Sequence, residues 1–106
     1  MRSEVSEVFS ALADDTRRAI YERLLAQPSG LTATQLSKDS SVSRQAIVKH
    51  LQLLGGAGLA RSLREGRDVL YLATPRGTEL ASKWLVENGA AWDRRLAALQ
   101  KRAKDS

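Results

Sequence analysis

The sequence predicts a mainly α-helical fold with one small β-hairpin, in the element order α-α-α-α-β-β-α. Three observations indicate this class. Apolar residues recur at helical spacing through most of the chain, two short apolar runs lie close together after a glycine-rich break, and a proline opens the last long amphipathic segment. The chain of 106 residues is long enough for one small domain, which we place at residues 1–106.

The first two helices are predicted at residues 4–13 and 15–27. The first has four apolar residues at helical spacing: Val5, Val8, Phe9 and Leu12. Asp14 is suited to cap the second helix, because its carboxylate can accept a hydrogen bond from a free N–H group of the first turn. The second helix has an apolar stripe with Tyr21 at its margin, formed by Ile20, Leu24 and Leu25.

A short third helix is predicted after the break at Pro28-Ser29-Gly30. Thr32 caps this helix, and Leu36 faces inward. The helix is expected to end around Asp39-Ser40-Ser41, and Val42 is expected to fill the core from the turn that follows.

The fourth helix is predicted over residues 44–54, with Ser43 as its N-cap. Three apolar residues give it a buried face: Ile47, Leu51 and Leu54. Gly55-Gly56-Ala57-Gly58 ends the helix, because glycine adopts the left-handed conformation of a helix C-cap. Residues 32–54 therefore form a helix-turn-helix.

A β-hairpin is predicted at residues 59–73, from two strand-like runs at residues 59–63 and 69–73. Residues 64–68 form the tip between them, where Gly66 is free to take a positive φ. A hairpin that follows a helix-turn-helix is the arrangement of a winged helix-turn-helix domain, in which the hairpin is the wing.

The last helix is predicted to begin at Pro75, with Thr74 as its cap. It carries a row of apolar residues: Leu80, Ala81, Trp84, Leu85, Ala91, Trp92, Leu96 and Leu99. Asn88-Gly89 can kink this helix or split it in two, so the continuity of the helix at this point is left open. Residues 101–106 are expected to fray.

The net charge of +5 is unevenly distributed. Residues 43–76 carry six Lys or Arg against two Asp or Glu, whereas residues 1–42 carry five against six. A basic region of this kind favours contact with the phosphates of a polyanionic partner. Charge alone leaves a second interpretation open, in which the region is a solvated face that keeps the protein soluble.

The face of the fourth helix opposite its apolar stripe has side chains that suit the major groove of DNA. Arg and Lys can hydrogen-bond guanine, Gln can hydrogen-bond adenine, and Val can touch a thymine methyl group. The predicted base contacts are Arg44, Gln45, Val48 and Lys49, and the predicted phosphate contacts are Ser43, Thr32 and Thr34. The alternative is an ordinary surface helix that happens to be basic.

His50 is the single histidine of a chain that has no cysteine. A thiolate site, or a site with several histidines in one chain, is therefore excluded, and we expect no metal and no other cofactor. His50 lies beside the apolar stripe of the fourth helix, so we expect it to hydrogen-bond a phosphate or to pack at the edge of the core.

Two arginines flank Gly66 in the wing, Arg64 and Arg67. A narrow minor groove attracts inserted arginine side chains, so we expect both to contact DNA there. The alternative is that they only make the loop soluble. Arg61 is not assigned, because it can lie on the other face of its strand.

Trp84 and Trp92 are eight residues apart and share roughly one face of the last helix. Two tryptophans and a row of leucines exceed what the thin core of a small domain can bury, which predicts a dimer interface. Two alternatives remain, a place in the core of the monomer and a ligand pocket lined by the tryptophans.

Several segments of the chain resemble motifs of ArsR-type bacterial repressors. They are Phe9-Ser10-Ala11-Leu12-Ala13-Asp14-Asp15-Thr16-Arg17-Arg18-Ala19-Ile20, Val42 to Leu51 followed by Leu53-Leu54, Ala57-Gly58-Leu59-Ala60, and Arg64-Glu65-Gly66-Arg67. The first departs from the usual Ala-Leu-Ala-Asp-Pro-Thr-Arg-Arg, because Asp15 stands in place of the proline. The resemblance covers about residues 5–75.

The resemblance implies a homodimeric winged-helix repressor. Its first and last helices, here residues 1–13 and 75–102, would form the dimer and place two recognition helices about 34 Å apart on a near-palindromic operator. The implied interface residues are Val5, Val8, Phe9, Leu80, Trp84, Leu85, Trp92, Leu96 and Leu99.

Metal sensing, which the best-known members of the family perform, is not implied here. Their ligands are cysteines near the recognition helix or His/Asp/Glu sets on the last helix, and this last helix has no histidine. Glu79, Glu87 and Asp93 therefore have no imidazole partners there, and the tail resembles a metal-free branch of the family.

The sequence thus predicts a sequence-specific DNA-binding transcriptional regulator, a repressor by family habit, whose partners are a double-stranded operator and a second copy of itself. A small-molecule or protein effector is left open. The alternatives are a winged-helix adaptor for other proteins and a non-specific DNA-binding protein. An enzyme is not expected, because no nucleophile–base pair and no phosphate-binding glycine motif is present.

The start of the chain, residues 1–7, does not resemble a signal peptide, and no apolar run approaches ~18 residues. We therefore expect a cytoplasmic protein without a membrane contact.

Overall fold

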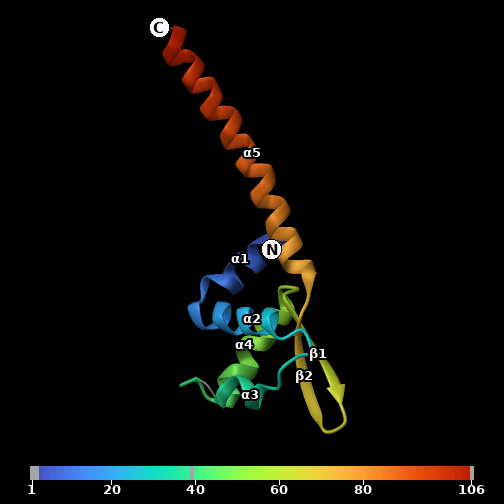
Figure 1. The fold of residues 1–106 in the computed structure, drawn as a ribbon. Coiled ribbons are helices and arrows are strands. Elements are labelled where there is room, and N and C mark those ends of the chain that lie inside the picture. Colours follow the sequence, from blue (N-terminus) through green and yellow to red (C-terminus); the bar gives the residue numbers. More distant parts are fainter. Residues whose placement is uncertain (1–2, 39, 106) are drawn as a thin grey trace.

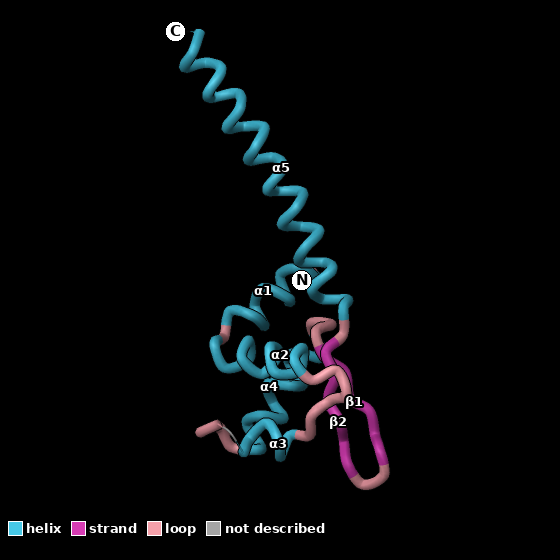
Figure 2. Tube along the Cα trace, in the orientation of Figure 1, coloured by secondary structure: helices cyan, strands magenta, loops and turns pink. Residues whose placement is uncertain are grey.

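The computed structural model describes residues 3–38 and 40–105 of the chain. Its elements are α1 (Glu4–Ala13), α2 (Asp15–Ala26), α3 (Ala33–Lys38), α4 (Arg44–Gly56), β1 (Ala60–Glu65), β2 (Asp68–Ala73) and α5 (Pro75–Asp105). Figures 1 and 2 show that α1, α2, α3, α4 and the hairpin form a small body, from which α5 projects. The predicted winged helix-turn-helix fold is confirmed. The helix end predicted around Asp39 and the start at Met1 and Arg2 lie outside the described residues.

The helices begin where side-chain oxygens accept backbone N–H groups. The Asp14 carboxylate accepts the N–H of Arg17 at 2.9 Å at the start of α2, and the Ser43 hydroxyl accepts the N–H of Ala46 at 3.2 Å at the start of α4. At α3, the Thr32 hydroxyl accepts from the N–H of Gln35, whose side-chain oxygen accepts the Thr32 N–H in return. These contacts confirm the predicted caps at Asp14, Thr32 and Ser43.

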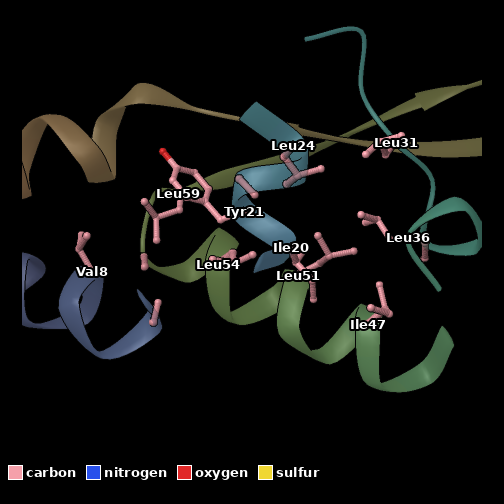
Figure 3. Close-up of a cluster of buried hydrophobic side chains, with 14 of the residues drawn as sticks. Val8, Ile20, Tyr21, Leu24, Leu31, Leu36, Ile47, Leu51, Leu54 and Leu59 are labelled. Atoms are coloured by element: carbon pink, nitrogen blue, oxygen red, sulfur yellow. The ribbon is translucent and has the colours of Figure 1, made fainter. Parts of the chain in front are cut away.

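The core lies between α1, α2, α3, α4 and the base of the hairpin (Figure 3). Ile47, Leu51 and Leu54 are buried there as predicted. Two expectations for α2 were wrong, because Tyr21 is only 4% exposed whereas Leu25 is 54% exposed. At about 100° per residue, Tyr21 falls on the same side of the helix as the buried positions 20 and 24, and Leu25 falls beyond it.

The wing is an antiparallel hairpin whose tip is shorter than predicted. Glu65 pairs with Asp68, so only Gly66 and Arg67 remain in the turn, and Arg64 belongs to β1. Gly66 has φ +62°, and in the described part of the chain only glycines have a positive φ. A two-residue turn with positive φ at its first position matches the twist of the strands.

The segment before α3 is bonded to the wing, which the sequence did not predict. Leu31 and Tyr71 exchange two backbone hydrogen bonds, of 3.0 and 2.8 Å. Gly30, with φ +94°, turns the chain into this pairing, and a Cβ there would lie 3.3 Å from Leu70 and Leu72. The pairing fixes the start of the helix-turn-helix against β2.

α5 is one continuous helix of 31 residues, without a break at Asn88-Gly89. It remains helical to Asp105, so the fraying expected from residue 101 is not observed, and Ser106 lies outside the described residues. The Thr74 hydroxyl donates to the carbonyl of Gly58 at 2.8 Å, which ties the start of α5 to the end of α4.

Only the first turns of α5 pack on the body. Its buried residues are Gly77 and Ala81, and the molecule measures 69 × 29 × 25 Å because the rest of the helix extends away (Figure 1). We call residues 86–105 the outer half of α5.

Candidate nucleic-acid interface

α4 separates its residues onto two faces. Ile47, Leu51 and Leu54 anchor one face in the core, whereas Arg44, Gln45 and Lys49 are exposed. A helix held from behind in this way can present its exposed side chains to a groove without unfolding.

Two of the predicted contact residues on α4 are less accessible than expected. Val48 is half-buried and packs against the core cluster, which limits the surface it can offer to a base. His50 is half-buried as well, and its Nδ1 lies 3.5 Å from Nη1 of Arg17 on α2. Arginine has no acceptor, so this contact requires Nδ1 to accept and leaves the proton of a neutral ring on Nε2.

A hollow of ≈ 430 Å³ lies between α3, the start of α4 and the wing. Four predicted contact residues line it together: Thr32, Thr34, Arg44 and Arg67. The sequence did not predict its other lining residues: Ala33, Gln35, Asp68, Val69 and Tyr71. Their proximity follows from the pairing of Leu31 with Tyr71, which joins positions 40 residues apart and leaves no local pattern in the sequence.

The hollow and its surroundings carry exposed cations. Among the residues that the structure describes, Arg44, Lys49, Arg64 and Arg67 have no ion pair. Asp68 is the one carboxylate among the described residues that line the hollow, against two guanidinium groups. This surface can therefore bind phosphate oxygens, for which arginine offers a planar pair of donors.

The wing divides its arginines between its two faces. Arg61 and Arg64 point to opposite sides of β1, because side chains alternate along a strand. Arg64 shares its face with Val69 and Tyr71, and Tyr71 lines the hollow, whereas Arg67 lies in the turn. Arg64 and Arg67 are both exposed, so both are free to meet a partner.

A second surface runs along α5. Its exposed large apolar residues are Trp84, Leu85, Val86, Trp92, Leu96 and Leu99. Between the two tryptophans lies an open hollow of ≈ 590 Å³ over Gly89 and Ala91. The guanidinium of Arg95 stacks 5.7 Å above the Trp92 ring.

α1 contributes to this second surface only in part. The rings of Phe9 and Trp84 meet edge to face, with centroids 5.5 Å apart, and both remain partly exposed. The expectation that Val8 belongs to a dimer interface was wrong, because Val8 is 0% exposed within the single chain. Val8 points about 100° away from the partly exposed Phe9, toward the core side of α1. It therefore stabilises the body instead.

Within residues 3–38 and 40–105, no three His, Cys, Asp or Glu side chains are close enough together to hold a metal ion. In the same part of the chain, no helix is both long and apolar enough to cross a membrane.

Sequence comparisons match the region that carries this interface. The helix-turn-helix domain family matches residues 12–62. The HTH-type transcriptional regulator YuzN of Bacillus subtilis is 40% identical over 73 residues, which are 63% of this chain and 78% of that protein. The HTH-type transcriptional repressor Rv2887 of Mycobacterium tuberculosis is 31% identical over 102 residues, covering 93% of this chain and 73% of that protein.

Solved structures share the whole arrangement. An ArsR-like transcriptional regulator from Rhodococcus sp. RHA1 superimposes with a TM-score of 0.80 at 40% identity, covering 92% of this chain and 91% of that one. The homodimeric winged helix-turn-helix DNA-binding domain of Mb0332 from Mycobacterium bovis has a TM-score of 0.63, covering 88% of this chain and 82% of that one. At 22% identity, the second match concerns the fold alone.

Proposed function

Because the chain belongs to the ArsR-like family of helix-turn-helix transcriptional regulators, we propose that it binds an inverted-repeat operator as a homodimer, with α4 in the major groove. The observation that carries this proposal is the hollow that gathers Arg44 and Arg67 beside the exposed face of α4. In this arrangement Arg44, Gln45 and Lys49 contact base edges, with a smaller contribution from Val48.

Phosphate contacts hold the helix in place. Thr34 and Arg44 approach the backbone from the hollow, while the Ser43 and Thr32 hydroxyls lie at the starts of α4 and α3. His50 can add a contact through Nε2, since its Nδ1 faces Arg17. The two wing arginines lie in the flanking minor groove, where the negative potential is enhanced.

The second copy covers α5. A helix that exposes two tryptophans and several leucines has a large apolar area in water, and monomeric proteins rarely leave such patches uncovered. The Mb0332 domain of the same fold is homodimeric. We therefore assign the dimer contact to Val5 and Phe9 of α1 and to α5, where the contact residues are Leu80, Trp84, Leu85, Trp92, Leu96 and Leu99.

The regulator is proposed to repress, as Rv2887 does according to its name, by occupying DNA that a polymerase needs. We propose that no metal takes part, because the chain has no cysteine and a single histidine, which lies on α4 next to Arg17. An effector, if one acts, is then a small organic molecule or another protein.

The test is a selection of bound fragments from random duplex DNA at physiological salt with a chelator present. We expect enrichment of an inverted repeat whose half-sites lie about 34 Å apart, one helical turn. Enrichment of no sequence, with equal binding to all fragments, would instead indicate a non-specific DNA-binding protein. No binding by a folded dimer would favour the adaptor role.

The selected operator then tests single side chains. Gln45→Ala should relax base preference at one position per half-site, at a cost of about 1–3 kcal/mol. Gln52→Ala is the matched control, because Gln52 is exposed seven residues further along the same helix. An unchanged preference in Gln45→Ala would remove Gln45 from the base contacts.

The wing is tested through salt dependence. Arg67→Ala should weaken binding to all sequences about equally and reduce the salt slope by roughly one unit. Arg94→Ala, which removes the same charge from the exposed surface of α5, should leave the slope unchanged. A wild-type slope in Arg67→Ala would show that this arginine does not contact phosphate.

A further inference from the structure

Two neighbouring arginines at the start of α2 lie against the end of α1. Nε of Arg17 donates to the carbonyl of Ala11 at 3.0 Å, and Nη1 of Arg18 donates to the carbonyl of Leu12 at 2.7 Å. The last four carbonyls of a helix have no partner within the helix, so both arginines satisfy acceptors that α1 leaves open.

Only Arg17 reaches a third element. Arg17 is half-buried, and its Nη1 lies 3.5 Å from Nδ1 of His50 on α4, whereas Arg18 is exposed and forms an ion pair with Asp15 at 2.8 Å. The Arg17 backbone is itself held by the Asp14 carboxylate. One guanidinium group therefore touches the end of α1 and the middle of α4 from a fixed point on α2.

This position lies between the two surfaces of the molecule. α4 carries Arg44, Gln45 and Lys49, and α1 contacts α5 through the rings of Phe9 and Trp84. Any rotation of α4 relative to the pair α1–α5 must change the distance from the Arg17 guanidinium to Ala11 or to His50. The planar, rigid fork of the guanidinium makes such a contact directional.

We propose that Arg17 is a positioning residue that fixes the recognition helix relative to the dimerisation helices, and thereby sets the half-site spacing that the dimer accepts. The proposal depends on the dimeric operator binding proposed above. It assigns Arg17 no contact with DNA. His50 is its partner on α4.

The first experiment needs no DNA. The chain has no cysteine, so Gln52→Cys provides one spin-label position per subunit on the exposed face of α4. Pulsed electron–electron double resonance then measures the distance between the spin labels on the two recognition helices of a dimer without DNA. We expect a narrow distribution in this background, a broad one when Arg17→Gln is added, and a narrow one with Arg18→Gln.

The second experiment measures the affinity for the selected operator and for versions with the half-sites moved by one and two base pairs. Arg17→Gln should reduce the preference for the native spacing about fivefold or more, while the base preference within each half-site stays unchanged. Arg18→Gln removes a comparable contact with α1 and should keep the native preference.

His50 supplies the reciprocal test. His50→Leu should reproduce the loss of spacing preference, because leucine cannot accept from Arg17. His50→Asn should restore it, because the amide oxygen can accept in place of Nδ1. If His50 only contacts phosphate, His50→Leu and His50→Asn should both change the salt slope, and neither should change the spacing preference.

The outcomes separate the two proposals. A dimeric Arg17→Gln protein with a narrow label distance and the native spacing preference overturns the positioning role, and it leaves the proposed function intact. A lower melting temperature in both arginine variants without a change in spacing shows that the two residues only stabilise α1. If the labelled Gln52→Cys protein without further changes shows no distance between subunits, the proposed dimer is overturned, and the positioning role with it.

Discussion

The body of the molecule, residues 3–38 and 40–85, buries a core of large apolar side chains, although some such as Leu25 and Leu53 remain exposed, whereas the outer half of α5 buries none. Leu24 and Leu54 are 1% and 0% exposed, but Trp92 and Leu96 are 60% and 48% exposed. The sequence pattern is similar in both regions, with apolar residues at helical spacing. What differs is the number of elements around each helix, because none of α1–α4, β1 and β2 packs on the outer half in the described part of the chain (Figure 1).

This difference shows that an apolar stripe on a helix does not by itself specify what packs against it. The stability of the body should be independent of protein concentration, since its contacts lie within one chain. The stability that the outer half contributes should depend on concentration, because a partner that binds only the folded form stabilises it by mass action.

The largest expected difference between the two regions comes from removing a leucine in each. Leu54→Ala should lower the free energy of unfolding by about 2–5 kcal/mol, because it leaves a cavity in the core. Leu96→Ala should change it by less than about 0.5 kcal/mol in a dilute, monomeric sample, because that side chain is 48% exposed and no other described element packs on it. Urea titration measures both, and equal costs would mean that the outer half packs within its own chain.

The next effect concerns the dimer. Trp92→Ala should raise the dissociation constant of the dimer roughly 30-fold or more, as expected for a buried tryptophan anchor, and DNA affinity should fall with it. Analytical ultracentrifugation measures the constant, with Arg94→Ala as an exposed control on the same helix. If the Trp92→Ala protein stays dimeric at the same concentrations, the interface lies elsewhere.

Two glycines of α5 give a smaller pair of effects with opposite signs. A Cβ at Gly77 would lie 2.8 Å from the carbonyl oxygen of Ala57 and from Cδ2 of Leu59, so Gly77→Ala should destabilise the body by about 1–3 kcal/mol. Gly89→Ala meets no atom within 4 Å and should stabilise the helix by up to about 1 kcal/mol in the monomer. Thermal unfolding of dilute samples checks both signs.

The smallest effect is the acid response of the body. The hydrogen bond from the backbone N–H of Arg17 lowers the pKa of Asp14 below its ordinary value of 3.8; burial opposes this shift in part, and the charge of Arg17 adds to it. A depressed pKa contributes stability that is present above pH 3.8 and lost as the pH falls through the lowered value.

Asp14→Asn tests this directly, since asparagine caps the helix without titrating. The stability difference between wild type and variant should shrink as the pH falls below 3.8, at any protein concentration. A difference that stays constant across this range would show that the charge of Asp14 contributes nothing.

Local patterns predicted the helices of the body well. The first helix has the bounds expected from its apolar spacing, and Asp14, Thr32 and Ser43 cap the helices that follow them. These features depend on residues within one or two turns of each other, so a single sequence contains the information. The buried position of Tyr21 was missed because residue 21 lies on the same side of α2 as the buried residues 20 and 24 rather than at the margin of their stripe.

The features that the sequence did not predict depend on distant contacts. The pairing of Leu31 with Tyr71 and the contact of Arg17 with His50 join residues 40 and 33 positions apart. The pairing of Leu31 with Tyr71 brings the start of α3 beside β2, and residues from both segments line the hollow at the interface. The sequence left the continuity of the last helix at Asn88-Gly89 open, and α5 continues through it, since the cost of one glycine, about 1 kcal/mol, is small against the rest of a 31-residue helix.

The unbroken course of α5 makes this helix sensitive to changes of length. One residue inserted near Gly89 would turn everything beyond it by about 100° and shift it by about 1.5 Å. Trp92, Leu96 and Leu99 would then face a different direction from Trp84 and Leu85, although no side chain had been altered. Insertions or deletions of about seven or about eleven residues nearly restore the original angle, so homologues with longer or shorter last helices should differ from this chain by two or three whole turns.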